Sequence, residues 1–143
     1  MESPLLQIHQ SLNAKLGDFA GWAMPLEYPA PVGGGTLAEH EAVRTNVGLF
    51  DVSHLGKIEV NGAGAKDWLN SIITNDLNKI LPGQAQYSML CNEAGGVIDD
   101  LIVYLKSDDA ILIIPNAANS AEVFSTLNGK IPQGMKIQNR HNA

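Results

Sequence analysis

Apolar residues near the start of the chain recur at every third or fourth position, as they do on one face of a helix. They are Leu5, Ile8, Leu12 and Leu16. The spacing predicts an amphipathic helix over residues 5–16 that ends near Gly17. Residues 18–29 lose this period and contain several aromatic side chains and two prolines. We expect an ordered but irregular segment there, anchored by Phe19 and Trp22.

Glycines and a capping pattern mark the start of a second helix. A flexible glycine triplet at 33–35 precedes Thr36, and Glu39 follows Thr36 at the spacing of a capping box. In such a box the Thr and Glu side chains satisfy the first free backbone amides of a helix. The pattern predicts a helix that begins at Thr36, runs to about Asn46 and stops at Gly48.

Beyond residue 55 the pattern becomes that of a mixed domain. Alternating or apolar runs predict strands at 56–60, 86–91, 97–105, 110–115 and, weakly, 136–138. Helical spacing predicts helices at 65–74 and 119–127. The connections between the three middle strands are short enough for hairpins. The fold class that follows is α+β, an antiparallel sheet meander with flanking helices rather than a parallel doubly wound sheet.

Length, charge and cysteine count narrow the class of protein. The 143 residues suit one domain, and a formal net charge of -6 with nine scattered basic residues argues against a nucleic-acid partner. No apolar run approaches a membrane span and the N-terminus shows no export or transit pattern, so we expect a soluble, cytoplasmic protein. Cys91 is the single cysteine and the four histidines lack metal-ligand spacing, so we expect no metal site.

Two adjacent aspartates interrupt the most apolar predicted strand. Because side chains alternate along a strand, Asp100 shares a face with Ile102 and Tyr104, and Asp99 points to the other face. A carboxylate in an apolar strand is costly unless it is hydrogen-bonded, and such groups are often kept for function. The face of Asp100 would suit a flat heteroaromatic ligand with an N–H donor. The alternative is that both aspartates lie at the strand entrance, satisfied by water and loop amides.

A second polar cluster lies at residues 51–54. Asp51, Ser53 and His54 are the residue types of a hydrolase triad. They are too close in sequence to converge as a triad does, since its members come from separate elements. We therefore favour a structural role, in which Asp51 and His54 hold a loop in place, over a catalytic one.

Six short motifs follow one another along nearly the whole chain. They are FAGWAMP at 19–25, EHEAVR at 39–44, GLFDVSH at 48–54, TND at 74–76, NEAGGVIDDLIVY at 92–104 and NAAN at 116–119. Each motif alone is modestly specific, whereas their order and spacing together are highly specific. With them the chain resembles the N-terminal region of the glycine-cleavage T-protein family, whose members are tetrahydrofolate-dependent aminomethyltransferases.

The resemblance implies a reaction and a set of residues. T-proteins transfer the aminomethyl carbon carried by the lipoyl arm of H-protein to tetrahydrofolate and release ammonia. Tetrahydrofolate is thus the implied cofactor, and lipoylated H-protein is the implied partner. The family's catalytic acid maps to Asp100, which would orient the pterin and assist proton movement. Its folate-contacting positions map to Leu55, Tyr87, Asp100, Ile102, Tyr104 and Asn116. Leu55 stands where the family usually has Met, an exchange that roughly conserves volume.

Two other functions remain open on the sequence. A folate-dependent demethylase of the same fold would act on methylated substrates without a lipoyl protein, and a non-catalytic module would bind folate without turnover. The motifs and the start at Met1 favour the aminomethyltransferase over the demethylase. The chain ends at Ala143 where the family continues, so we expect residues 1–143 to be the N-terminal portion of the folate-binding fold. This portion alone should have little or no activity, and its exposed surface could cause self-association.

Overall fold

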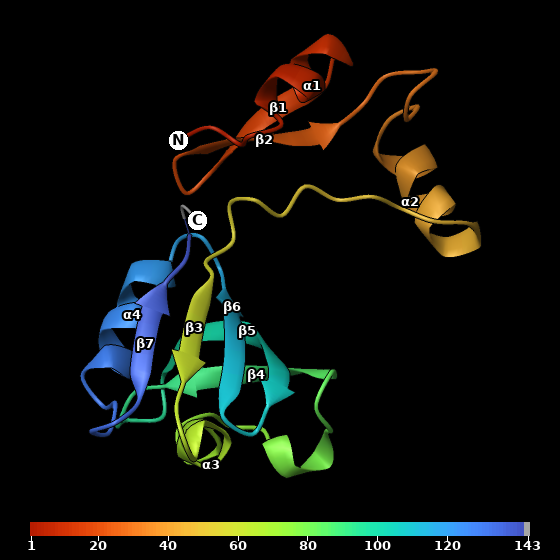
Figure 1. The fold of residues 1–143 in the computed structure, drawn as a ribbon. Coiled ribbons are helices and arrows are strands. Elements are labelled where there is room, and N and C mark those ends of the chain that lie inside the picture. The colour runs from red at the N-terminus through yellow and green to blue at the C-terminus, as the bar shows by residue number, and fades with distance from the viewer. Residues whose placement is uncertain (142–143) are drawn as a thin grey trace. The chain divides into compact units, whose positions relative to one another are not determined.

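The computed structural model describes residues 1–141, and the chain divides into two compact units. Unit 1 runs from Met1 to His54, and unit 2 begins at Leu55 (Figure 1). Each unit has its own sheet, of two strands in unit 1 and five in unit 2. That residues 1–143 form a portion of one folate-binding domain stays a prediction.

Unit 1 begins with a short helix followed by a hairpin. Its first elements are α1 (Leu6–Ser11), β1 (Lys15–Phe19) and β2 (Trp22–Glu27). The helix predicted over residues 5–16 is therefore too long, and Leu16 lies on β1. Asn13 has a φ of 56°, a left-handed conformation that a helix cannot continue through and that Asn tolerates better than most residues.

The β1–β2 hairpin replaces the irregular segment expected over residues 18–29. Phe19 pairs with Trp22 across a two-residue turn in which Ala20 and Gly21 have φ of 53° and 82°. Turns with two positive φ angles match the twist of the strands that they join. Trp22 is 7% exposed and is an anchor as predicted, whereas Phe19 is 42% exposed and is not.

The helix predicted from Thr36 is confirmed as α2 (Thr36–Thr45), but its capping box is wrong. The N-cap residue is Gly35, which has no side chain to cap the helix, and the Glu27 carboxylate accepts from the first helical N–H, that of Thr36, at 3.1 Å. The Glu39 carboxylate instead accepts a hydrogen bond of 2.6 Å from the backbone N–H of Tyr28, and the Thr36 hydroxyl donates to Glu27 at 2.7 Å. Both candidate capping groups thus form hydrogen bonds with residues at the end of β2.

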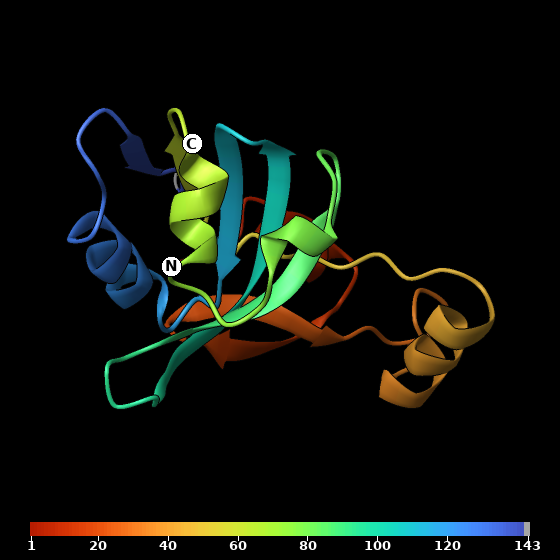
Figure 2. The same ribbon diagram turned by 90° about the horizontal axis from the view of Figure 1, so that it is seen from below.

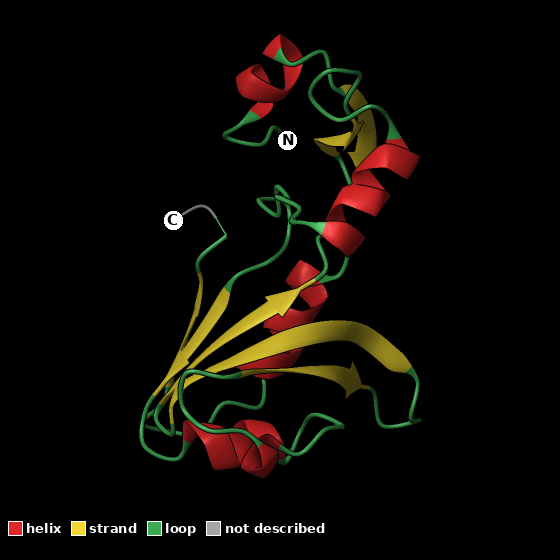
Figure 3. Ribbon diagram, turned by 90° about the vertical axis from the view of Figure 1, so that its right-hand side faces the viewer, coloured by secondary structure: helices red, strands yellow, loops and turns green. Residues whose placement is uncertain are grey.

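Unit 2 is built on a five-stranded antiparallel sheet, seen in Figure 3, with strand order β4–β5–β6–β3–β7. Its strands are β3 (Ile58–Asn61), β4 (Ala85–Cys91), β5 (Val97–Ser107), β6 (Ala110–Pro115) and β7 (Lys136–Asn139). Consecutive strands β4, β5 and β6 form the predicted meander, and β3 lies between β6 and β7. The α+β class with an antiparallel meander is confirmed.

Two helices and one helical turn connect the strands. They are α3 (Ala65–Asn70), the 3-10 turn η1 (Leu77–Lys79) and α4 (Ser120–Asn128). Figure 2 shows α3 lying in front of the strands. The helix predicted over 65–74 ends early because its last residues join the sheet. Ile73 forms a bridge with Leu90, and the N–H of Thr74 donates to the Met89 carbonyl at 3.0 Å.

The hydrophobic core of unit 2 lies between the helices and one face of the sheet. Its members include Leu69 of α3, Val123 and Leu127 of α4, and strand residues Ile58, Val60, Leu101, Val103 and Ile113. Burying one such aliphatic side chain stabilises the fold by roughly 1.5 to 3 kcal/mol. Along β5, alternate residues from Asp99 to Leu105 are buried, whereas those from Asp100 to Tyr104 are exposed. The two faces predicted for this strand are confirmed.

Candidate functional site

The antiparallel register of the meander brings polar residues together at one end of β5. Asp100 pairs with Met89 of β4, and Leu101 pairs with Pro115, the last residue of β6. The chain therefore leaves β6 beside the two aspartates, which places Asn116 next to them. Residues distant in sequence meet here because hairpin connections return the chain to the same end of the sheet.

Asp99 points into the core side and is 2% exposed. One carboxylate oxygen accepts from the backbone N–H of Asn116 at 2.8 Å. The other accepts from the side-chain amides of Asn116 at 3.1 Å and Asn119 at 2.8 Å. The alternative of water-exposed aspartates therefore does not hold for Asp99. Loop amides satisfy it, but in a buried position, as a buried carboxylate requires.

Asp100 lies on the opposite, exposed face of β5 and is held by two side chains. The Tyr87 hydroxyl donates to Oδ2 at 2.7 Å, and the Asn116 side-chain amide donates to Oδ1 at 3.0 Å. The same amide also donates to the Asp100 backbone carbonyl at 2.9 Å. The hydrogen bond to Asp100 raises the pKa of Tyr87 above its ordinary value, because losing the phenolic proton would break it.

Apolar and aromatic side chains continue this face away from Asp100. We call the surface formed by the outward-pointing residues of β4, β5 and β6 the outer sheet face; its members are Tyr87, Met89, Asp100, Ile102, Tyr104, Leu112 and Ile114. Register places Tyr87 beside Ile102 and Ile102 beside Ile114. The outer sheet face thus carries one carboxylate at the edge of a row of flat and aliphatic groups, as ligand sites for ring systems do.

The structure brings some of the predicted site residues into direct contact and others only onto the same face of the sheet. Hydrogen bonds join Tyr87, Asp100 and Asn116 directly. Ile102 and Tyr104 share the outer sheet face with them. Leu55 is half-buried and is placed only by its backbone, because the N–H of the next residue, Gly56, donates to the Pro115 carbonyl at 2.9 Å.

Two residues of the cluster were not predicted as site residues. Asp99 was assigned to the opposite face without a partner, and Asn119 was assigned only to the start of a helix. The signal available was the repetition of Asn at positions 116 and 119, directly after an apolar strand. Asn side chains in such loops often hydrogen-bond to neighbouring groups. The pattern gives no indication of which carboxylate they would reach.

Asp51 in unit 1 holds separate parts of the chain together, in agreement with the structural role predicted for it, whereas the same role for His54 stays a prediction. Asp51 accepts hydrogen bonds from the Ser3 hydroxyl, from His9 Nε2 at 2.8 Å and from the Ser53 backbone N–H at 2.9 Å. The other ring nitrogen of His9 lies 2.7 Å from the Tyr28 hydroxyl. Burial would raise the pKa of Asp51, but the hydrogen bonds from Ser3, Ser53 and His9 outweigh it and hold that pKa well below its ordinary value.

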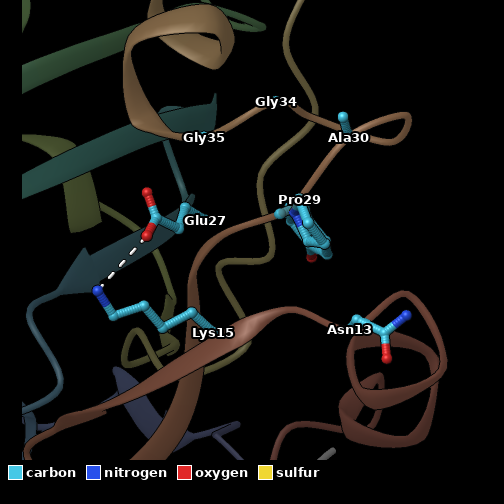
Figure 4. A pocket seen from close by; sticks show the side chains of 8 residues that line it. Asn13, Lys15, Glu27, Pro29, Ala30, Gly34 and Gly35 are labelled. Atoms are coloured by element: carbon cyan, nitrogen blue, oxygen red, sulfur yellow. Dashed lines mark hydrogen bonds and ion pairs between the residues drawn. The ribbon is translucent and has the colours of Figure 1, made fainter.

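Unit 1 also has a surface hollow of about 370 Å³, drawn in Figure 4. Its lining residues are Asn13, Lys15, Glu27, Tyr28, Pro29, Ala30, Gly34 and Gly35. Lys15 and Glu27 form an ion pair of 3.4 Å, and the Glu27 carboxylate also accepts from Thr36. The Thr36 hydrogen bonds and the Lys15 charge lower the pKa of Glu27. None of the predicted site residues lines this hollow.

Within residues 1–141 there is no group of three or more His, Cys, Asp or Glu side chains that could hold a metal ion. In the same part of the chain no helix has the length and apolar character needed to cross a membrane.

Comparison with known proteins identifies the family. Residues 5–143 match the GCVT N-terminal domain. The chain is 55% identical over 139 residues to an aminomethyltransferase from Frankia alni, covering 97% of this chain and 37% of that protein. It is 52% identical over 141 residues to an aminomethyltransferase from Mycobacterium avium, with 99% and 37% covered.

A solved structure agrees with these relatives. The crystal structure of glycine cleavage system aminomethyltransferase T from Bartonella henselae matches with a TM-score of 0.87 and 34% sequence identity, over 99% of this chain and 38% of that one. The chain thus spans little more than a third of the length of the relatives that it matches. It belongs to the family of the GCVT N-terminal domain.

Proposed function

We propose that this chain is the N-terminal part of an aminomethyltransferase of the glycine cleavage system, and that its outer sheet face binds tetrahydrofolate. The enzyme would move the aminomethyl carbon from lipoylated H-protein to tetrahydrofolate and release ammonia. The observation that carries the proposal is the Asp100 carboxylate, held by Tyr87 and Asn116 at the edge of an exposed aromatic and aliphatic row. The names of the relatives support the transferase over the demethylase.

The residues present fit a reduced pterin. Its ring is flat and carries several N–H donors, and the outer sheet face offers a carboxylate together with Ile102 and Tyr104, which are 36% and 43% exposed. Charge-assisted hydrogen bonds to a carboxylate are about twice as strong as neutral ones. Asp100 can therefore fix the ring's orientation while the neighbouring side chains cover its surface.

The roles of this chain's residues follow from that fit. Tetrahydrofolate would supply the nucleophilic amine that takes up the one-carbon unit. Asp100 would accept a hydrogen bond from an N–H of the ring, and its carboxylate would hold a proton as the amine reacts. Tyr87, which donates to Oδ2, would keep the carboxylate in place. Holding a reacting ring in one geometry is itself a large part of catalysis.

A titration tests the binding step. We expect calorimetry to show saturable binding of tetrahydrofolate to the 143-residue chain and binding at least about tenfold weaker in Asp100→Asn, since removing a charged acceptor costs over 1 kcal/mol. Asp67→Asn is the matched control, because Asp67 is an exposed carboxylate of α3, which packs on the core side. Equal affinities for the chain and Asp100→Asn would reject the assignment of Asp100. No binding to the chain would reject a folate site on it.

A further inference from the structure

The side-chain amide of Asn116 bridges the two aspartates. Its nitrogen lies 3.1 Å from Asp99 Oδ1, 3.0 Å from Asp100 Oδ1 and 2.9 Å from the Asp100 carbonyl oxygen. An amide nitrogen has two hydrogens to donate, so these three acceptors use all of its capacity. A flip of the amide would exchange its nitrogen and oxygen and place the oxygen next to these three acceptor oxygens, where no hydrogen bond is possible. The Asn116 amide therefore has one allowed orientation.

This orientation determines what Asn116 offers to a ligand. None of the hydrogen bonds among residues 1–141 uses Asn116 Oδ1, so this oxygen remains an acceptor beside the Asp100 carboxylate. The Tyr87 hydroxyl has given its hydrogen to Asp100 and keeps only acceptor capacity. Asp100 and the two polar side chains that hold it, Tyr87 and Asn116, thus present acceptors and no donors to a ligand.

Asp99 supplies the buried one of the three acceptors that hold the Asn116 amide. Both of its oxygens accept hydrogen bonds, one from the Asn116 backbone and one from the Asn116 and Asn119 side chains. A carboxylate can accept at both positions, whereas an amide there would turn a donor toward Asn116. None of the ion pairs among the described residues includes Asp99, so its buried charge rests on amides alone. Such burial is costly, which favours a functional reason for it.

We propose that Asp99 is a positioning residue that fixes the Asn116 amide, so that the site offers only acceptors and selects flat heterocycles with adjacent N–H donors. The inference rests on the proposed function and adds the chemistry of selection. A ring with an amino group and a ring N–H would satisfy Asn116 Oδ1 and Asp100 together. If the same ring carries a carbonyl in place of the amino group, the carbonyl oxygen lies against an acceptor oxygen of the site. Neither oxygen then has a hydrogen-bond donor.

Matched ligands test the selection. The probes are a reduced pterin, which has a 2-amino group, and the reduced lumazine that has a 2-oxo group instead. We expect the chain to bind the pterin at least about tenfold more tightly. In Asp99→Asn this preference should fall to about twofold or less. Asn119→Ala removes one hydrogen bond from Asp99 without touching the Asn116 bridge, so it should keep the preference.

A purely structural role predicts a different result. If Asp99 only stabilised the fold, Asp99→Asn would weaken binding of both probes alike and leave their ratio unchanged, which would overturn the inference. Equal loss of the preference in Asn119→Ala would overturn it too, because that variant keeps the carboxylate. The ratio is therefore the decisive quantity, and each protein serves as its own reference for folding.

A second measurement needs no ligand. The Asn116 side-chain amide protons, followed by NMR, should exchange slowly in the chain and in Asn119→Ala but rapidly in Asp99→Asn. Unchanged exchange in Asp99→Asn would overturn the positioning role even if folate binds. If the chain binds neither probe while the exchange behaves as expected, the proposed folate site and the selection fail on this chain, and the positioning role stands.

Discussion

The phenol of Tyr87 on β4 donates a hydrogen bond of 2.7 Å to the carboxylate of Asp100 on β5. The two residues are diagonal neighbours across the strand pair, since Tyr87 is opposite Ile102 and Asp100 is opposite Met89. Diagonal neighbours in a sheet lie within reach of a long side chain. The bond therefore depends on register, and both residues face solvent on the outer sheet face.

The first prediction concerns the Tyr87 phenol. Its pKa should lie above the ordinary value near 10, and it should fall toward that value in Asp100→Asn, because an amide neither carries the charge nor accepts as strongly. An NMR pH titration of the Tyr87 ring resonances measures both values. Asp67→Asn, with its carboxylate on α3, should leave the titration unchanged. A Tyr87 pKa that is the same in all three proteins would contradict the hydrogen bond.

The second prediction concerns acid stability of unit 1. The pKa of Asp51 is lowered in the folded state, so the carboxylate contributes stability above its unfolded pKa of about 4, and this contribution is lost as pH falls below that value. Asp51→Asn should reduce stability at neutral pH by roughly 1 to 3 kcal/mol and flatten the acid dependence. Denaturant unfolding of a Trp68→Phe background reports unit 1 through Trp22.

Two outcomes would count against this prediction for Asp51. One is an unfolding midpoint, followed by Trp22 fluorescence, that does not change between neutral and acid pH. The other is an equal change in Glu41→Gln, since Glu41 is an exposed carboxylate of α2. The control is matched in kind, because both variants replace a carboxylate of unit 1 with its amide.

The third prediction concerns Gly56, beside the end of β6. A Cβ at this position would lie 2.3 Å from Ser120 Oγ and 2.7 Å from Pro115 Cγ, closer than atoms can approach. Gly56→Ala should therefore displace the end of β6, lower the stability of unit 2 by about 1 to 3 kcal/mol and weaken ligand binding at Asn116. Thermal unfolding and calorimetry measure the two effects.

A second-site change tests the steric cause. Ser120→Gly removes the Ser120 Oγ and Cβ that crowd the added methyl group. The double variant Gly56→Ala/Ser120→Gly should thus recover part of the stability lost in Gly56→Ala, measured against Ser120→Gly alone. If the two changes add without any recovery, the loss does not come from this contact.

Local pattern predicted unit 2 well because its strands obey simple rules. The apolar run at 97–105 predicted β5, and side chains alternate between the two faces of any strand, so Asp99 and Asp100 could be assigned to opposite faces before the structure. The β1–β2 hairpin was missed since its Ala20–Gly21 turn is not the usual Asn-Gly or Asp-Gly signal, and Pro25 lies within β2.

These local rules do not predict contacts between residues that are distant in sequence. Asp51 meets Ser3 and His9 from 48 and 42 residues away, and Asn119 meets Asp99 from 20. No periodicity relates these pairs, because the path of the chain between them decides the contact. The capping-box prediction was wrong for a similar reason, because the Glu39 carboxylate accepts from the backbone N–H of Tyr28 and not from the start of its own helix.

The fourth prediction concerns turnover by the chain itself. Because the chain covers only 37% of the length of its aminomethyltransferase relatives, we expect little or no release of ammonia when it is mixed with aminomethyl-loaded H-protein and tetrahydrofolate. A catalytic acid alone supplies only part of a rate enhancement, and positioning of both substrates supplies much of the rest. Ammonia release by this chain, compared with a full-length relative assayed beside it, measures the difference. A rate for the chain equal to that of the full-length protein would contradict this expectation and show that residues 1–143 are sufficient for the whole reaction.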